Sequence, residues 1–335
     1  MVGASTVATK LIRDALAAEP HVATQTLAKR LYAKHPELWV SCERCRSTIR
    51  SLRGANGVDN RKHRARHVAE RTFEESEACR RWGALLPEPE QSTWQWYTLP
   101  ERVARWLVLA DMHVPYHDRE ALAAVLAHAD GHCDGVLVLG DAVDAYQLSW
   151  WLRDPRRRRF AEEVAAWLRI LDAIQQVAGT VVWKAGNHEF RLERYLMAKA
   201  PELFGMPQFT WQSFCELEKR GIVWVPENCP IEHHQLSIIH GHEWGARFAS
   251  PVNPARGAFL KAHECVLEAH GHRTSHHVEP TLRQRPISCW SIGCLCSLHP
   301  EYRSLGNKWD HGFAYLDAGS EWKVTTHRII DGKVV

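Results

Sequence analysis

Five short clusters of acid, amide and imidazole side chains punctuate the last two-thirds of the chain. In order they read Asp111-Met112-His113, Gly140-Asp141-Ala142-Val143-Asp144, Gly186-Asn187-His188-Glu189, His240-Gly241-His242 and His270-Gly271-His272. Oxygen and imidazole donors of this kind bind divalent metals. One ion cannot use this many mixed ligands, whereas two ions about 3.5–4 Å apart, bridged by a carboxylate and a water, can. The chemistry of such centres is hydrolysis of phosphate esters.

We predict seven metal ligands in these clusters. Alternation along an extended backbone turns the first aspartate and the histidine two residues later to the same side. Nitrogen and oxygen donors without a thiolate favour manganese, with iron, zinc or nickel as alternatives. The predicted ligands of the two ions are Asp111, His113, Asp141, Asn187, His240, His270 and His272.

Apolar runs that predict buried strands precede the clusters. Residues 106–110, 136–139 and 181–185 are such runs, and helical patterns cover 120–129 and 159–177 between them. This alternation predicts an α/β fold with a sheet covered by helices. After residue 220 strand patterns dominate, which predicts a second sheet facing the first; they cover residues 222–225, 236–239, 265–268, 287–292, 313–316 and 322–328.

The order of the motifs resembles the calcineurin-like metallophosphoesterase family, whose motifs run Asp-x-His, Gly-Asp-x-x-Asp, Gly-Asn-His-Asp/Glu, His-Gly and Gly-His-x-His. The resemblance covers residues 104–335 and implies a four-layer α/β/β/α sandwich. Shorter stretches resemble a subgroup common in phages and prophages. These are residues 26–29 with 50–54, 253–256, 293–296 and 309–313.

The resemblance also implies a role for each site residue. Asp111, His113 and His272 would hold the first metal, Asn187, His240 and His270 the second, and Asp141 would bridge them. His188 would be the catalytic acid beside the substrate, oriented by Asp144. We therefore expect a metal-bridging hydroxide to attack phosphorus while His188 protonates the leaving oxygen.

Two departures from the family pattern change this assignment. Ala269 stands where the last motif has glycine, and a rival register beginning at Gly271 would use Thr274 in place of a second histidine. The register with His270 and His272 completes both metal shells. Ala145 replaces the arginine that often follows the second motif, so substrate phosphate needs another cation, Arg191 first and Arg273 second.

A basic head precedes this body. Residues 1–66 carry a net charge of +8 and the remainder −5, which indicates a polyanionic partner for the head. Helical patterns followed by a stripe of Arg46, Arg50 and Arg53 resemble a helix-turn-helix domain that contacts DNA or RNA. A small helical bundle with a solvated basic face is the alternative. We take residues 67–103 as a connector that packs on the body through Trp82, Trp94 and Trp96.

Three further features keep two interpretations each. Trp150 and Trp151, with the arginines at 156–159, either stack bases and follow phosphates or pack inward at a solvated helix start. His242 either supports a ligand or faces the substrate. Cys289, Cys294 and Cys296 are expected to be packing residues, because a structural zinc would need a fourth ligand.

The chain shows neither a signal-peptide pattern nor an apolar run of about 18 residues, so we expect a cytoplasmic protein with reduced thiols. The predicted activity is dimetal phosphoester hydrolysis, with a nucleic acid or nucleotide favoured as substrate. A small-molecule or protein phosphomonoesterase is one alternative. The other is a nucleic-acid-binding protein that uses the fold as a scaffold. The sequence leaves the oligomeric state open.

Overall fold

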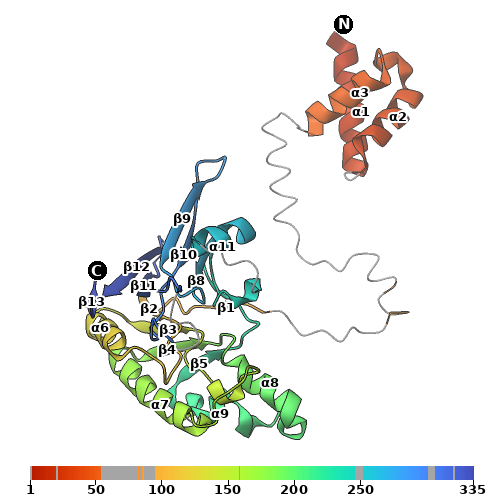
Figure 1. Cartoon of the computed structure of the whole chain (residues 1–335). Helices are drawn as coiled ribbons and strands as arrows, with labels where there is room; N and C mark the ends of the chain where they lie inside the picture. Colours follow the sequence, from red (N-terminus) through yellow and green to blue (C-terminus); the bar gives the residue numbers. More distant parts are fainter. Residues whose placement is uncertain are drawn as a thin grey trace. The chain divides into compact units, whose positions relative to one another are not determined.

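The computed structural model describes residues 2–19, 22–53, 82, 85–86, 95–157, 159–245, 252–300, 306–319 and 321–335. The chain divides into two compact units, Met1–Gln91 and Ser92–Val335 (Figure 1). Residues 54–66 of the predicted basic head lie outside the described residues, as do residues 67–81 of the connector and its Trp94.

Within residues 2–53, the described part of the N-terminal unit forms α-helices around a small apolar core. They are α1 (Val2–Ala18), α2 (Thr24–Lys34) and α3 (Cys42–Arg53), with a 3-10 turn, η1 (Pro36–Leu38), between the last two. Ile12, Cys45 and Ile49 are fully buried, so α3 packs by the face that carries Cys45 and Ile49. Ser41 caps α3, since its Oγ accepts from the Arg44 backbone N–H at 3.1 Å.

The second unit contains two β-sheets. One sheet has the order β13-β12-β11-β2-β3-β4-β5 and the other β1-β6-β7-β8-β10-β9. The strands are β1 (Tyr97–Thr98), β2 (Arg105–Leu109), β3 (Gly135–Leu139), β4 (Thr180–Lys184), β5 (Ile222–Val225), β6 (Ile231–His233), β7 (Leu236–Ile238), β8 (Cys265–Glu268), β9 (Ser275–Pro280), β10 (Pro286–Ser291), β11 (His311–Asp317), β12 (Lys323–Ile330) and β13 (Lys333–Val334).

Helices lie on the outer faces of both sheets (Figure 1). The α-helices of this unit are α6 (Arg119–Ala129), α7 (Phe160–Val177), α8 (Phe190–Lys199), α9 (Trp211–Phe214), α10 (Leu217–Arg220) and α11 (Pro254–Ala262). The 3-10 turns are η3 (Tyr146–Leu148), η4 (Pro201–Leu203), η5 (Pro207–Phe209) and η6 (His242–Trp244).

The alternation of side chains in β2 shows how the layers form. Leu107 and Leu109 point into a core shared with α6 and α7, whereas Trp106 and Val108 point into the core between the two sheets. All four are fully buried, as expected for a central strand covered on both faces. On the other sheet, α11 packs against Val266 of β8. The result is the predicted four-layer α/β/β/α arrangement.

The predicted second sheet is present, but it does not hold all the strands assigned to it. The strands after residue 220 do not all belong to the second sheet, because β5 pairs with β4 and β11 pairs with β2 in the first. The strand β12 then adds to β11. Pairing partners are set by contacts between segments distant in sequence, which local patterns do not report.

The end of the predicted connector contributes to the body. The strand β1 pairs with β6, and Leu99 and Val103 are buried in the core between the sheets. Trp82 and Trp96 are 52% and 38% exposed, so neither is a core residue. Among the described residues, every helix is too short or too polar to span a membrane.

Candidate metal centre

The predicted ligands lie on loops at the carboxyl ends of parallel strands. Strands β2, β3 and β4 run parallel in one sheet, as do β7 and β8 in the other. The clusters that follow these strands therefore meet at one edge of the sandwich. Two glycines allow the close approach, since a Cβ at Gly140 would collide with the His240 ring and one at Gly186 with the Asp141 carboxylate.

Five of the seven predicted ligands have a left-handed backbone. This conformation is uncommon outside glycine and clusters at functional sites. The loops thus hold strained residues at the positions where their side chains turn inward. The five residues, with φ between 48° and 61°, are Asp111, His113, Asp141, His270 and His272.

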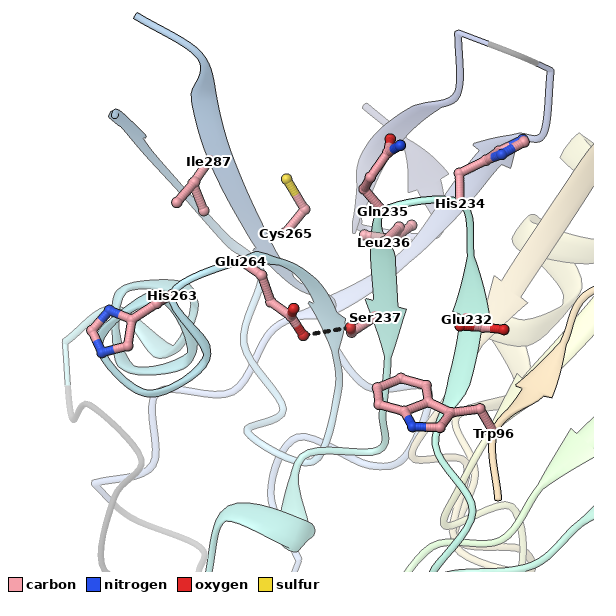
Figure 2. A pocket seen from close by; sticks show the side chains of 10 residues that line it. All are labelled: Trp96, Glu232, His234, Gln235, Leu236, Ser237, His263, Glu264, Cys265 and Ile287. Atoms are coloured by element: carbon pink, nitrogen blue, oxygen red, sulfur yellow. Dashed lines mark hydrogen bonds between the residues drawn. The ribbon is translucent and has the colours of Figure 1, made fainter. Parts of the chain in front are cut away.

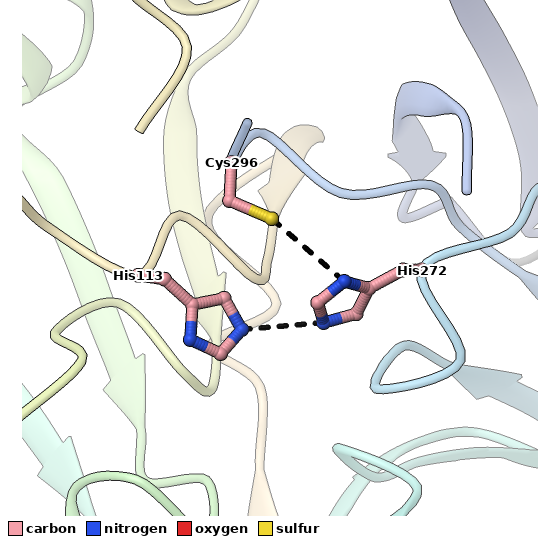
Figure 3. A group of neighbouring side chains, drawn as sticks. All are labelled: His113, His272 and Cys296. Carbon is pink, nitrogen blue, oxygen red and sulfur yellow. Dashed lines mark hydrogen bonds between the residues drawn. The ribbon is translucent and has the colours of Figure 1, made fainter. Parts of the chain in front are cut away.

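One group of donor atoms forms around Asp111. The Nε2 atoms of His113 and His272 are 3.2 Å apart (Figure 3). Asp111 Oδ1 lies 3.2 Å from His272 Nε2 and 3.8 Å from His113 Nε2. All three side chains are buried. This is the set predicted for the first metal.

A second group forms around Asp141. Its Oδ2 is 3.2 Å from His240 Nε2 and 3.8 Å from His113 Nε2. Donor atoms of Asp141, His240 and His270 lie within 4.8 Å of one another, and so do those of Asp111, His113 and Asp141. Asp141 therefore belongs to both groups, which is the geometry that a bridging ligand needs.

The donor atoms fit divalent ions. A buried polar atom without a partner is costly, so such atoms normally pair. Here oxygen and nitrogen atoms are left without a hydrogen bond although they are buried, and they are of the kinds that bind divalent metals. These atoms are Asp111 Oδ1, Asn187 Oδ1, His240 Nε2 and His270 Nδ1.

Hydrogen bonds fix the orientation of three rings among the predicted ligands. His240 Nδ1 donates to the Leu139 carbonyl at 2.8 Å, which turns Nε2 toward Asp141. His113 Nδ1 lies 3.3 Å from Asp144 Oδ2, and His272 Nδ1 lies 3.7 Å from Cys296 Sγ. Such partners on the far ring nitrogen are typical of metal-binding histidines.

Burial and neighbouring charges shift the pKa values of His240 and His270 in opposite directions. Burial alone would lower the pKa of His240, but the Asp141 and Asp111 carboxylates raise it to about 10. Burial and the neighbouring His240 lower the pKa of His270 to about 4. His270 is thus a neutral imidazole, the form that binds metals.

Beside the two donor groups, His188 contacts both Asp144 and Arg191. Its Nδ1 donates to the Asp144 carbonyl at 2.9 Å, and its Nε2 lies 2.9 Å from a guanidinium nitrogen of Arg191. Arg191 also donates to the Asp144 carbonyl at 2.8 Å and lies 3.3 Å from its carboxylate. Burial lowers the pKa of His188, but Asp141 and Asp144 outweigh it and raise the pKa.

Both histidines of the preferred register lie among the donor groups. His270 and His272 each belong to one donor group, whereas Thr274 Oγ1 donates to Asp310 at 2.8 Å. The geometry thus favours His270 over Thr274. Arg273 is half-buried, and its carbonyl accepts from Ser291 at 2.8 Å.

Glu189 organises the site, a role that the sequence reasoning missed. Its buried carboxylate accepts from the backbone N–H groups of Asp141, Ala142, Val143 and Gly186 at 2.8–3.2 Å. It therefore ties the loop after β3 to the loop after β4. The one sequence feature that could have indicated this role is the position of Glu189 at the end of the Gly-Asn-His-Glu motif.

A buried ion pair supports the loop after β7. Lys184, fully buried, lies 3.2 Å from Glu243, which accepts from the backbone N–H groups of His240 and Gly241. His242 bonds Glu227 at 2.9 Å and lies 3.4 Å from Glu243. These contacts place His242 in the support of the loop.

The structure also places the tryptophans and the cysteines for which the sequence left two interpretations open. Trp150 and Trp151 do not pack inward, because they are 66% and 80% exposed, and α7 begins only at Phe160. Cys296 is buried against His272 and, together with His113, forms a further group of metal-type donors (Figure 3). Cys289 packs separately in the core under α11.

A pocket of about 500 Å³ lies away from the metal-type donors (Figure 2). Leu236 and Cys265, the first residues of β7 and β8, line it, so it sits at the opposite end of these strands. Trp96 forms part of its wall, and Glu264 accepts from Ser237 at 2.6 Å. None of the predicted site residues lines this pocket.

Two facing sheets between helices, with acid, amide and imidazole donors at the strand ends, define a metallophosphoesterase type of protein. The sequence pattern of the calcineurin-like phosphoesterases matches residues 104–289, and the chain belongs to this family. Family members act on phosphate esters.

Relatives and solved structures of similar sequence or fold are known. The Gene 54 protein of Mycobacterium phage L5 is 27% identical over 63% of this chain and 88% of its own length. The Gene 54 protein of Mycobacterium phage D29 is 29% identical over 68% and 95%. Vps29 structures from Chaetomium thermophilum and Cryptosporidium parvum cover 69% and 70% of this chain and 94% and 95% of their own. Their identities are 11% and 12% and their TM-scores 0.37 and 0.39.

Proposed function

We propose that this chain hydrolyses phosphate esters with two divalent metal ions, manganese foremost. The observation that carries the proposal is the pair of donor groups that share Asp141. Asp111, His113 and His272 would hold one ion, and Asn187, His240 and His270 the other. When bound, the ions would acidify a water and neutralise phosphate charge.

His188 is the proposed acid for the leaving oxygen. Its Nδ1 donates to the Asp144 carbonyl and its Nε2 accepts from the Arg191 guanidinium, so Nε2 is the atom that would take up a proton and pass it to the substrate once Arg191 has turned to the phosphate. The raised pKa favours the protonated ring that this role requires. Asp144 orients the ring and also contacts His113, so it links the acid to a metal ligand.

Arg191 is the proposed cation for the substrate phosphate. Position 145 holds a buried alanine, and the Arg191 guanidinium reaches the carbonyl of the preceding residue, Asp144. Arg191 and His188 Nε2 face one another, so a phosphate oxygen that enters between them would accept from both. Arg273 is kept as the second candidate because it directly follows His272.

Metal loading and hydrolysis of simple phosphate mono- and diesters test this proposal together. Asp141→Ala should lose both metal equivalents and activity, because it removes the shared ligand. His188→Ala should keep its metal and lose about 10²- to 10⁴-fold in turnover. Asp172→Ala, which removes an exposed carboxylate on α7, is the matched control and should retain metal and activity.

The same assay separates the alternatives. Less than one equivalent of metal on the wild-type chain after manganese loading would support the scaffold interpretation. Normal hydrolysis by Asp141→Ala would refute the site assignment. Comparison of mono- with diesters distinguishes a phosphatase from a phosphodiesterase.

We also propose that the N-terminal unit contacts DNA or RNA through α3. Arg44 and Arg50 are exposed on that helix while Cys45 and Ile49 are buried on its other face. An Arg44→Ala/Arg50→Ala variant of the full chain should bind duplex or single-stranded oligonucleotides more weakly in fluorescence anisotropy. A Lys10→Ala/Arg13→Ala variant on α1 is the charge-matched control, and equal effects of the two would argue against an α3 surface.

The described cysteines are all free thiols. Free thiols support a reducing compartment, and we propose the cytoplasm.

A further inference from the structure

A short exposed apolar segment follows the Gly-Asp-x-x-Asp motif. Trp150, Trp151 and Leu152 are 66%, 80% and 100% exposed. A single exposed apolar residue needs no explanation, whereas contiguous exposed apolar surface marks a binding site. The segment begins six residues after Asp144, which contacts His113 and His188 in the site.

The base of this segment is anchored. The Asp154 backbone N–H donates to Tyr146 Oη at 2.9 Å, and Gln147 Nε2 donates to the Asp154 carbonyl at 3.2 Å. The Arg153 guanidinium donates to the Gln147 carbonyl. Hydrogen bonds on both sides of the tryptophans thus hold the segment against η3, so the rings are presented to solvent from a fixed base.

Helix α8 connects the tryptophans to the proposed phosphate site. The Arg194 guanidinium lies over the Trp150 ring, 4.9 Å from its centroid. Arg191, one turn earlier on α8, contacts Asp144 and His188. Three helical residues rise about 4.5 Å, so Arg194 beside Trp150 lies one helical turn from Arg191 in the proposed phosphate site.

The charge of this surface indicates the kind of ligand. The sequence from 153 to 159 holds five arginines, of which the structure describes Arg153, Arg156, Arg157 and Arg159. One aspartate accompanies them, Asp154, which pairs with Arg156 at 2.9 Å. Arg194 on α8 is also exposed. Exposed aromatic faces among arginines suit a ligand that is both flat and anionic, and nucleobases joined by phosphates have both properties.

We infer that Trp150 and Trp151 form a base-stacking platform, so that the substrate is a nucleotide or single-stranded nucleic acid whose phosphate reaches the centre at Asp141. This inference rests on the proposed phosphoesterase function and adds its substrate class. A base stacked on the platform holds the adjoining phosphate near Arg191 and His188. A duplex keeps its bases within the helix stack and cannot use the platform.

The test compares substrates that differ only in their bases. The full-length, manganese-loaded protein is given a short oligothymidylate, an oligomer of the same length built from abasic tetrahydrofuran units, and thymidine nucleotides. We expect a lower KM for the oligothymidylate than for the abasic oligomer. Trp150→Ala/Trp151→Ala should raise the KM for the oligothymidylate roughly 5- to 100-fold and leave the abasic oligomer unchanged.

The Trp150→Phe/Trp151→Phe variant is the matched control, because it keeps aromatic faces and should retain most of the preference. Leu282→Ala removes an equally exposed apolar side chain far along the chain and should change nothing. Equal kinetics of the alanine variant and the wild type on the oligothymidylate would overturn the platform. So would tryptophan-dependent binding to anionic phospholipid vesicles without any effect on the oligonucleotide.

The proposed function can fail separately. If the metal-loaded protein hydrolyses none of these esters, the phosphoesterase proposal fails. Base stacking on the platform can be measured even then, because the oligothymidylate should quench tryptophan fluorescence in the wild type and not in the alanine variant. If nucleotides and oligomers show the same dependence on the two rings, the ligand is the nucleotide unit itself. A dependence limited to the oligomers identifies single-stranded nucleic acid as the ligand.

Discussion

At the residue scale, the imidazoles of the centre differ in what their second nitrogen contacts. His240 donates to a carbonyl, His113 faces a carboxylate and His272 faces a thiol, while His270 Nδ1 is buried without a partner. These contacts aim the other nitrogen of the first three rings at the carboxylates of Asp111 and Asp141. Substitution of His270, whose Nδ1 has no partner, is therefore the most direct test of the predicted ligands.

We predict that His270→Ala loses one of two metal equivalents while Thr274→Ala keeps both. The reason is that Thr274 Oγ1 is committed to Asp310, whereas His270 lies in the Asp141 group. Elemental analysis after manganese loading measures the difference. Metal loss in the Thr274 variant with full loading of the His270 variant would establish the rival register.

At the element scale, the loops are held by carboxylates that come from other elements. Glu189, just before α8, binds the backbone of the loop after β3, and Glu243 binds the backbone that follows β7. Glu163 of α7 does the same for η3, since its Oε2 accepts from the Tyr146 backbone N–H at 3.3 Å. The site is thus positioned by helix and turn residues as well as by the strands before it.

Glu163 predicts a pH dependence of stability. Burial, and then the nearby Asp144 carboxylate, raise its pKa to about 8 from an ordinary value of 4.5. A raised carboxyl pKa means that the folded state favours the protonated form. Its stabilising contribution is full below about pH 4.5 and is lost as the pH rises through about 8.

Glu163→Gln should remove this loss, since the amide keeps the acceptor oxygen without titrating. We expect the variant to gain on the order of a few kcal/mol over the wild type as the pH rises from 5 to 8. Urea unfolding at both ends of that range measures it. Parallel pH profiles for the two proteins would show that Glu163 does not titrate there.

At the scale of the whole molecule, the two compact units have separate cores. Ile12, Ile49 and their neighbours form the core of the first, while the second has the layers on either side of β2. A unit with its own core can unfold as its own cooperative step. All seven predicted ligands lie in the second unit.

We therefore predict two thermal transitions, of which metal shifts only one. Manganese at about 100 times its dissociation constant would stabilise the second unit by about 2.7 kcal/mol per site. Calorimetry with and without a chelator measures the shift, and Asp141→Ala should abolish it. A metal-dependent shift of both transitions would contradict independent units.

The sequence by itself determined the elements and the order of the motifs. A strand that is buried on both faces is apolar along its length, and residues 136–139 are such a run. The chemistry of the site then requires particular residue types after each run. The tertiary structure alone decided which strands share a sheet, because β2 pairs with β11 some two hundred residues away. It also decided the support by Glu189 and the exposure of Trp150, since both depend on neighbours that no local pattern records.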